Sequence, residues 1–213
     1  MHAKQALGSC DLGKVTICRK LLVVLAALCC SPAATATELT FNIGGGPQFG
    51  SDSSSGDSGD SSQINKTVGV DFSFFRHTRS PRSSIRIGAS YTYMRANSDE
   101  FNEIHALSIY PELTMYPSEE SWIRSIMPGS SEPFFYVRAL GPSYISANRL
   151  GDRKQAENFA FQAQVGVGAL VKMKDERELV IAVSWKHFSN ANLFEDNDGI
   201  DLPIVLNVGV RFR

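Results

Sequence analysis

Residues 159–172 read Phe-Ala-Phe-Gln-Ala-Gln-Val-Gly-Val-Gly-Ala-Leu-Val-Lys, and their side chains alternate between two kinds. Every odd position from Phe159 to Val171 is apolar, whereas most even positions carry Ala, Gly, Gln or Lys. Successive side chains of a β-strand point to opposite faces, so a period of two predicts a strand with one apolar face. Residues 201–212 repeat the pattern, with apolar side chains at the even positions from Leu202 to Phe212. Both stretches are therefore predicted to be half-apolar strands.

Eight runs of this kind follow one another, at 38–49, 65–76, 85–97, 105–116, 133–145, 158–172, 179–191 and 201–212. Each is about ten residues or longer, which lets a tilted strand cross a bilayer. The less apolar faces carry charged side chains among Gly, Ser and Thr, as in the lumen of a small barrel. These charged residues are Asp71, Arg86, Glu112, Arg138, Lys172, Lys186 and Arg211. We predict an all-β fold, an eight-stranded antiparallel transmembrane β-barrel, with a soluble β-sandwich as the alternative.

The first 36 residues have the pattern of a secretory signal peptide, with a short buried helix as the other interpretation. Lys14, Arg19 and Lys20 precede an apolar run at 21–30, and small residues follow at 31–36. Removal of 1–36 would leave a single barrel domain at 37–213. All four cysteines lie within 1–36, so the exported domain would have no disulfide and no cysteine-based metal site or nucleophile.

Charge and hydropathy exclude other classes of protein. The chain has 21 Lys and Arg against 22 Asp and Glu, which leaves no basic surface for nucleic acid. No apolar run reaches about 18 residues, the length that a membrane-spanning helix needs. With both barrel termini on the periplasmic side, the connections 50–64, 98–104, 146–157 and 192–200 face outside. The long inner connection 117–132 is either a short helix or a loop.

Aromatic residues toward the strand ends are expected to form girdles at the membrane interfaces. They are Tyr91, Tyr93, Tyr110, Tyr116, Phe134, Phe135 and Tyr136.

The seventh run carries the residues with chemical potential. Its odd positions from Ile181 to Trp185 form an apolar stripe that ends in His187 and Ser189, near the outer edge of the membrane. Neighbouring side chains on one face come within hydrogen-bond reach, so the imidazole could take the serine proton and activate the hydroxyl. Such catalysis also needs an acid that holds the ring in one tautomer. On spacing alone, His-x-Ser is more often a polar fringe at the interface.

The hairpin resembles the end of the PagL family, outer-membrane lipid A 3-O-deacylases. The matching residues are His187-Phe188-Ser189-Asn190-Ala191 and Asn197-Asp198-Gly199-Ile200-Asp201. The resemblance implies Ser189 as nucleophile, His187 as general base and Asp201 as the orienting acid. It also implies that Asn190 and Asn197 help to stabilise the oxyanion.

Asp201 departs from the family pattern, which usually has Glu at this position. Its side chain is shorter, and Glu195, Asp196 and Asp198 are alternative acids. Parity also places Asp201 on the lumen-facing side of the last strand, so a bulge near Pro203 is required. His77 and His105 are interpreted as surface or turn residues.

The resemblance implies an outer-membrane serine esterase that hydrolyses the 3-O-linked acyl chain of lipid A, the lipid of lipopolysaccharide. A nucleophile on the barrel exterior meets such esters in the outer leaflet, and the reaction requires no metal or cofactor. The alternatives are a non-enzymatic structural or adhesive barrel and a phospholipase-type esterase. A homodimer is left open, because no motif sets the oligomeric state.

Overall fold

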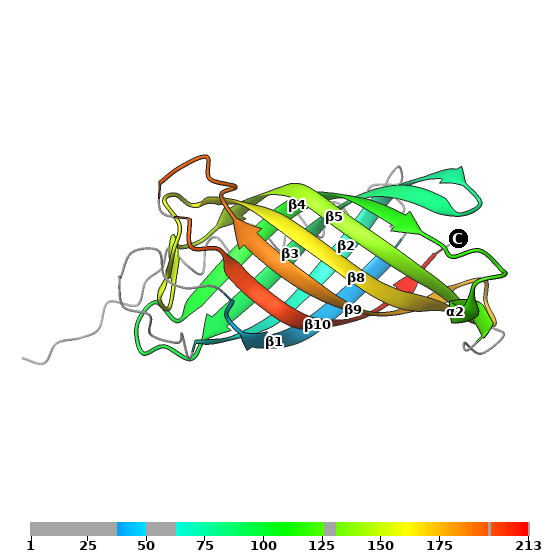
Figure 1. Ribbon diagram of the computed structural model, residues 1–213, viewed down its shortest axis with the longest axis horizontal. Coiled ribbons are helices and arrows are strands. Elements are labelled where there is room, and N and C mark those ends of the chain that lie inside the picture. Colours follow the sequence, from blue (N-terminus) through cyan, green and yellow to red (C-terminus); the bar gives the residue numbers. More distant parts are fainter. Residues whose placement is uncertain (1–37, 50–62, 126–130, 196, 213) are drawn as a thin grey trace, which may run out of the picture. The chain divides into compact units, whose positions relative to one another are not determined.

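A computed structural model describes residues 38–49, 63–125, 131–195 and 197–212, all within the compact unit Ala36–Arg213. Eight antiparallel strands form a closed barrel in the order β1-β10-β9-β8-β5-β4-β3-β2 (Figure 1). Their bounds are β1 (Glu38–Pro47), β2 (Ile64–Ser80), β3 (Ser83–Ala96), β4 (Glu103–Met115), β5 (Ser131–Ile145), β8 (Phe159–Lys172), β9 (Glu178–Ser189) and β10 (Ile200–Arg211). The predicted fold is confirmed, and each of the eight alternating runs forms one strand. The predicted signal peptide lies outside the described residues.

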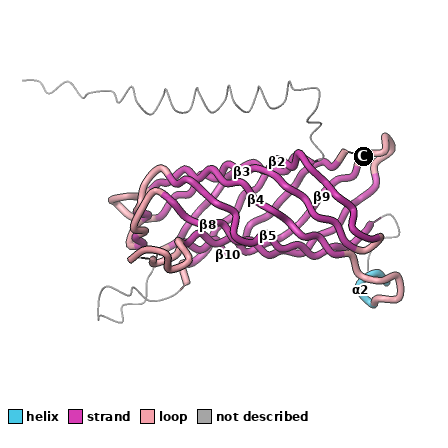
Figure 2. The backbone as a smooth tube through the Cα atoms, turned by 90° about the horizontal axis from the view of Figure 1, so that it is seen from above, coloured by secondary structure: helices cyan, strands magenta, loops and turns pink. Residues whose placement is uncertain are grey.

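The two ends of the barrel differ in their connections. We call the end at which β9 finishes and β10 begins the outer end, and the end at which β10 finishes the inner end. An unexpected two-stranded hairpin at the outer end pairs β6 (Arg149–Leu150) with β7 (Arg153–Lys154). A single helical turn, α2 (Trp122–Ser125), lies at the inner end, within the connection for which a helix or a loop was expected (Figure 2). No helix in the described ranges combines the length and the apolar character needed to cross a membrane.

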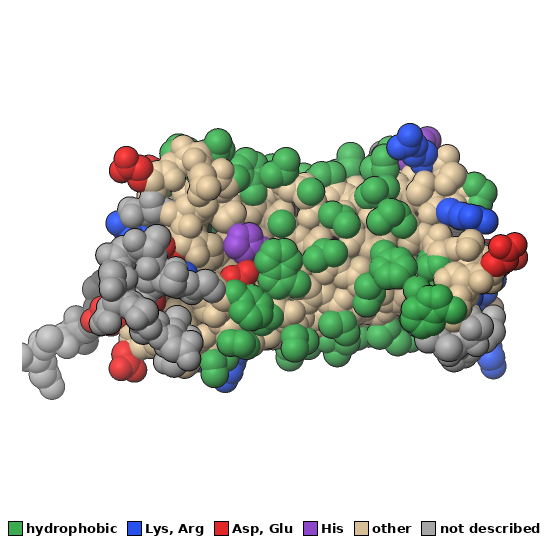
Figure 3. Space-filling model, in the orientation of Figure 1, with side chains coloured by type: hydrophobic (Ala, Val, Ile, Leu, Met, Phe, Trp, Pro, Cys, Tyr) green, Lys and Arg blue, Asp and Glu red, His purple; other side chains and the backbone are tan. Residues whose placement is uncertain are grey.

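The exterior of the barrel is apolar along its side. Large hydrophobic side chains of all eight strands are exposed, among them Phe41, Ile109, Val167 and Ile204. Figure 3 shows such side chains spread over the wall of the barrel, with most charged ones near its two ends. In hydrocarbon every backbone N–H and C=O must be paired, and a closed barrel pairs them between strands. An apolar outer wall on a closed sheet is therefore the surface of a membrane-spanning barrel.

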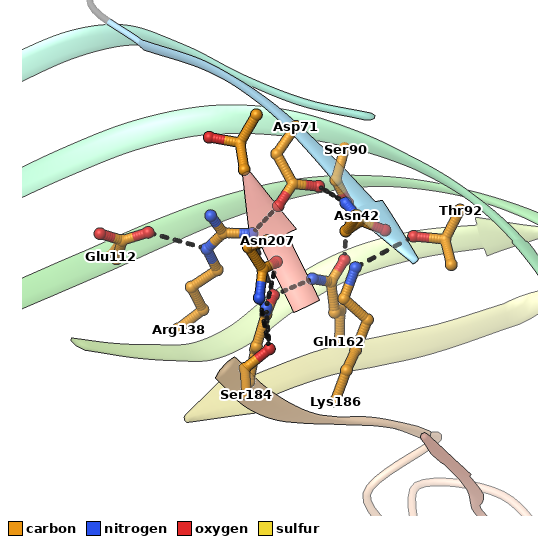
Figure 4. A network of polar contacts seen from close by, with 12 residues as sticks. Asn42, Asp71, Ser90, Thr92, Glu112, Arg138, Gln162, Ser184, Lys186 and Asn207 are labelled. Carbon is orange, nitrogen blue, oxygen red and sulfur yellow. Dashed lines mark hydrogen bonds and ion pairs between the residues drawn. The ribbon is translucent and has the colours of Figure 1, made fainter. Parts of the chain in front are cut away.

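The inner half of the lumen is filled by buried ion pairs. Arg138 binds Asp71 and Glu112, while Arg86 binds Glu112 and Glu38. Figure 4 shows how Arg138 lies between its two carboxylates. Six of the seven charged residues predicted for the lumen are buried within the barrel, and Lys172 is the exception. Lys172 is exposed because it is the last residue of β8, next to the inner turn.

The outer half of the lumen contains an apolar cluster beside its buried polar residues, which the alternation did not predict. The cluster lies behind the outer ends of β9 and β10. Its members are Met94, Ala96, Ile104, Ala106, Ile145, Leu150, Ala160, Phe188, Ile200, Leu202 and Val205. The lumen is thus packed in its inner and outer halves, and the outer ends of β9 and β10 pack against buried side chains.

Four of the predicted girdle aromatics face the lumen instead, and for them the girdle assignment is wrong. Tyr110, Tyr116, Phe134 and Tyr136 are all buried, whereas Tyr91, Tyr93 and Phe135 are partly or fully exposed. Three of the buried rings lie opposite a glycine on the neighbouring strand. The pairs are Tyr110 with Gly88, Phe134 with Gly168 and Tyr136 with Gly166. Each ring fills the space that the missing glycine side chain leaves, a packing that stabilises curved sheets.

Candidate active site

The outer end of β9 presents His187 and Ser189 on the exterior of the barrel. Lys186 and Phe188 between and beside them are completely buried in the lumen, whereas His187, Ser189 and Trp185 are partly exposed. The outward direction predicted from the period of two is therefore what the strand adopts. Both candidate groups lie on the lipid-facing wall, within the last three residues of β9.

A β-bulge brings Asp201 to the same face as His187. Asp201 is the register partner of His187, and Leu202 is that of Lys186, but the next pair is Val205 with Ser184. Three steps on β10 thus match two steps on β9, so one extra residue lies in β10 around Pro203. A single extra residue reverses the parity of the strand beyond it. The shift required by the sequence is present, and it turns Asp201 from the lumen toward the imidazole.

His187 and Asp201 form the central contact of the site. Nδ1 of His187 lies 2.9 Å from Oδ1 of Asp201, with 25% of the His187 side chain exposed and 8% of Asp201. The ring of His187 also stacks on Trp185, with centroids 5.3 Å apart and an interplanar angle of 20°. The acid and the indole together fix the plane of the imidazole, and Nε2 is the ring nitrogen that remains for a reaction.

Gly199 allows the imidazole to lie against the backbone. A Cβ atom at this position would stand 2.7 Å from Cε1 of His187, which is closer than such atoms approach. The residue also has a φ of 62°, in the left-handed region that favours glycine. Gly199, part of the motif matched in the sequence, is therefore required by both backbone and packing.

The carboxylate of Asp201 accepts a hydrogen bond from the amide of Gln48, the residue that directly follows β1. Nε2 of Gln48 donates to Oδ2 of Asp201 over 2.7 Å, and Oε1 of Gln48 accepts the Asp201 N–H over 3.0 Å. Nδ2 of Asn65 donates both to that Oε1, over 2.7 Å, and to the Asp201 carbonyl, over 3.0 Å. Gln48 and Asn65 are buried. We call Gln48 and Asn65 the amide clamp.

Asn197 braces the loop that follows the serine. Its Oδ1 accepts the backbone N–H of Asn190 over 2.8 Å, and its Nδ2 donates to Oδ1 of Asn192 over 2.8 Å. Asn190 is fully buried, so its side chain does not face the exterior. Directly after it, Ala191 and Asn192 turn the chain with φ values of 55° and 59°. In this structure the two asparagines organise the turn next to Ser189.

The outer hairpin holds the same loop from the other side. The backbone N–H of Lys154 donates to Oδ2 of Asp198 over 2.9 Å, and the Asp198 N–H donates to the Lys154 carbonyl over 3.1 Å. Arg153, which is buried, donates to the carbonyls of Asp198 and Phe49. Asp198 is therefore engaged with β7. Glu195 is exposed on the loop, and Asp196 lies outside the described residues.

The structure brings the His and the acid into contact but leaves the serine separate. Within the described ranges, no hydrogen bond joins Oγ of Ser189 to the imidazole. Apolar side chains border both residues on β8, because Phe161 is the register partner of Ser189 and Ala163 that of His187. Catalytic hydrogen bonds are often long without substrate and shorten in the complex.

Gln48, Asn65 and Arg153 were missed in the sequence. Their polar character was visible, but the contacts of Gln48 and Asn65 with Asp201 depend on the pairing of β1 with β2 and β10, and those of Arg153 with the site loop depend on a hairpin inside a loop. No local pattern contains that information.

Fold and site together define a membrane-spanning eight-stranded barrel that carries a serine and a His–Asp pair on its lipid-facing wall. A family model described as lipid A 3-O-deacylase (PagL) matches residues 124–211, which include the whole of the site hairpin. The resemblance to the PagL family is thus confirmed. No curated protein sequence matches the chain significantly.

Two solved structures are similar to the chain. The outer membrane enzyme PagL is 18% identical, with a TM-score of 0.52 over 81% of this chain and 97% of that one. The outer membrane protein OprG from Pseudomonas aeruginosa is 11% identical, with a TM-score of 0.38 over 83% and 95%. The first similarity shows the fold, and the chain is an outer-membrane-type β-barrel.

Proposed function

We propose that this chain is an outer-membrane serine esterase that removes the 3-O-linked acyl chain of lipid A. The observation that carries the proposal is the 2.9 Å contact between His187 and Asp201 on the outside of the barrel, on the same stripe as Ser189. A His–acid pair beside a serine is the arrangement that activates a hydroxyl nucleophile. Its place on the lipid-facing wall selects an ester within the membrane.

In the proposed reaction, Oγ of Ser189 attacks the carbonyl carbon of the ester while Nε2 of His187 takes its proton. Asp201 accepts the N–H of Nδ1, which keeps Nε2 free as a base and stabilises the imidazolium that forms. The bond from the acyl carbon to the sugar oxygen breaks, and His187 returns the proton to that oxygen. Water, deprotonated by His187, then hydrolyses the acyl-enzyme to a free fatty acid.

The developing oxyanion requires donors close to Ser189. The resemblance assigns this role to Asn190 and Asn197, and the turn that they brace suggests how they act. Asn197 binds the backbone N–H of Asn190 and the side chain of Asn192, and thereby holds the turn that carries the backbone N–H groups of Ala191 and Asn192. We assign the oxyanion contact to these N–H groups and the support of the turn to the two asparagines.

The position of the site suits a substrate that stays in its leaflet. Ser189 and His187 are at the outer end of β9, bordered by Trp185 and Phe161. Acyl chains can lie along this apolar wall while the ester meets the nucleophile at the edge of the hydrocarbon. The substrate therefore needs no extraction from the membrane.

Mass spectrometry of lipid A tests the proposal. Cells that express the wild type are expected to contain lipid A that lacks one 3-O-linked acyl chain. Cells with Ser189→Ala or His187→Ala are expected to lack this species at equal barrel content, because either change costs at least about 10³-fold in rate. Unmodified lipid A in all three strains would refute the proposal.

Purified protein with defined lipids tests the substrate class. We expect hydrolysis of lipid A and little hydrolysis of a glycerophospholipid under the same conditions. Faster hydrolysis of the phospholipid would reassign the site as a phospholipase.

A further inference from the structure

Two cations face each other on the lipid-facing wall at the outer end of the barrel. Lys66, the third residue of β2, is the register partner of Arg95, the last but one residue of β3. Both side chains are exposed, whereas the neighbouring Asn65 and Met94 are completely buried in the lumen. Lys66 shares its outward stripe with Ile64 and Val68, so it is flanked by side chains that face lipid.

The barrel places one carboxylate beside the two positive charges, which leaves an excess of positive charge at the pair. Like charges directly opposite one another destabilise a pair of strands. Throughout the described part of the chain, neither side chain forms a hydrogen bond or an ion pair. Glu103 is the register partner of Arg95 on β4, and its carboxylate, which also accepts the hydroxyl of Tyr93 over 3.2 Å, offsets one of the two positive charges. An anion from outside the protein would remove this repulsion.

The cation pair and Ser189 lie on the same side of the barrel wall. Two strands, β10 and β1, lie between β9 and β2, so three strand spacings of nearly 5 Å separate these strands, about 14 Å across the sheet. The row of Lys66 meets β9 near Trp185, and Ser189 lies four residues, about 13 Å, further along that strand. On the row that contains Lys66, the partners are Gly45 on β1 and Ile204 on β10. Gly45 has no side chain, and Ile43 and Ile204 beside it are among the most exposed apolar residues, at 60% and 63%.

We infer that Lys66 and Arg95 bind a phosphate group of the lipid A molecule whose ester lies at Ser189, an inference that rests on the proposed function. Guanidinium groups bind phosphate oxygens bidentately, and an ammonium adds a flexible point charge. The sugar lies over Gly45, and acyl chains pack on Ile43 and Ile204. Two anchors, the phosphate and the ester, orient the lipid so that one particular ester reaches the nucleophile.

Steady-state kinetics with two forms of lipid A test this site. The substrates are phosphorylated lipid A and the same lipid after removal of its phosphates. For the double variant Lys66→Gln with Arg95→Gln, we expect KM to rise about 10-fold on the phosphorylated lipid, with kcat within twofold. On the dephosphorylated lipid the variant and the wild type should have equal KM values. The control is Arg79→Gln with Arg82→Gln, an equal change of charge in exposed residues at the inner end.

An equal rise in KM on both lipids, or the same rise in the control, would overturn the inference. A binding titration separates it from the proposed esterase activity. Detergent-solubilised Ser189→Ala protein is titrated with each lipid at low and high salt. Phosphate-dependent, salt-sensitive binding that is lost with Lys66→Gln and Arg95→Gln supports the site even if no ester is cleaved. Hydrolysis with phosphate-independent binding refutes the site and leaves the esterase intact.

Discussion

The buried network around Arg138 and the site around His187 use similar groups in opposite ways. In the lumen, Arg138, Asp71 and Glu112 are almost fully buried, and each charged group has a partner of opposite sign. At the outer end, Asp201 is saturated by the imidazole and the amide clamp, but Ser189 and Nε2 of His187 are left open toward the exterior. The comparison teaches that the Arg138 network pairs its charges with one another for stability, whereas the wall leaves two groups open toward the exterior.

Among the variants that test this comparison, Asp201→Asn is expected to have the largest effect on kcat. The amide keeps the size of the side chain but cannot hold the imidazole in the reactive tautomer, so kcat should fall about 10³- to 10⁴-fold. Measurement of kcat on lipid A at equal folded protein checks this. Glu195→Gln, on the exposed loop, should retain wild-type activity. If Glu195→Gln instead abolished activity and Asp201→Asn did not, Glu195 would be the acid.

Arg138→Met should lower the stability of the barrel and leave kcat unchanged. The change leaves the carboxylates of Asp71 and Glu112 without their shared cation, which is expected to lower the free energy of unfolding by about 3–5 kcal/mol. Urea titrations of the barrel in lipid vesicles measure this value. Under conditions where the variant is folded, its kcat should be close to that of the wild type. A loss of kcat in the folded variant would show that the two regions are coupled.

Gly199→Ala tests how closely the imidazole is positioned. The new methyl group meets Cε1 of His187, and displacement of the ring by about 1 Å is expected to reduce kcat about 10²-fold. Gly151→Ala is the control, since Gly151 also has a positive φ but its Cβ would meet Gln63 and not His187. Comparable loss in both variants would trace the effect to backbone strain instead of to the ring.

Gln48→Met should have the smallest effect of the four. It preserves the volume of the side chain but removes the N–H donated to Asp201, so kcat is expected to fall about 10-fold with KM unchanged. Gln162→Met is the matched control, because Gln162 is equally buried but has no contact with Asp201. Equal kinetics for the two variants would mean that the clamp does not position the acid.

The sequence predicted the wall of the barrel better than its lumen. A period of two sets the direction of His187 and Ser189, and the parity conflict at Asp201 required the bulge that β10 contains near Pro203. The same reasoning failed for Tyr110 and Tyr136, because a ring opposite glycine turns inward to fill the lumen. Packing across the lumen depends on several strands together, whereas the alternation describes one strand at a time.

The support of the site was also beyond local patterns. Asn190 and Asn197 were found through the resemblance to the PagL family, but their hydrogen bonds within the loop are visible only in three dimensions. Gln48 is 153 residues from Asp201 in the chain, and closure of the barrel makes them neighbours.

That closure has a consequence for biogenesis. Asp201 belongs to the last strand and Gln48 follows the first. The contact between Asp201 and the amide clamp therefore crosses the pair of strands, β1 and β10, that closes the barrel. Before the first and last strands pair, Gln48 does not contact Asp201. Asp201 is then not positioned to orient the imidazole of His187. Ester hydrolysis is therefore expected to switch on with the final pairing event, and time-resolved refolding into vesicles would register catalysis and barrel closure together. Under the proposed function, the esterase would therefore gain its activity only once the barrel has closed in its membrane.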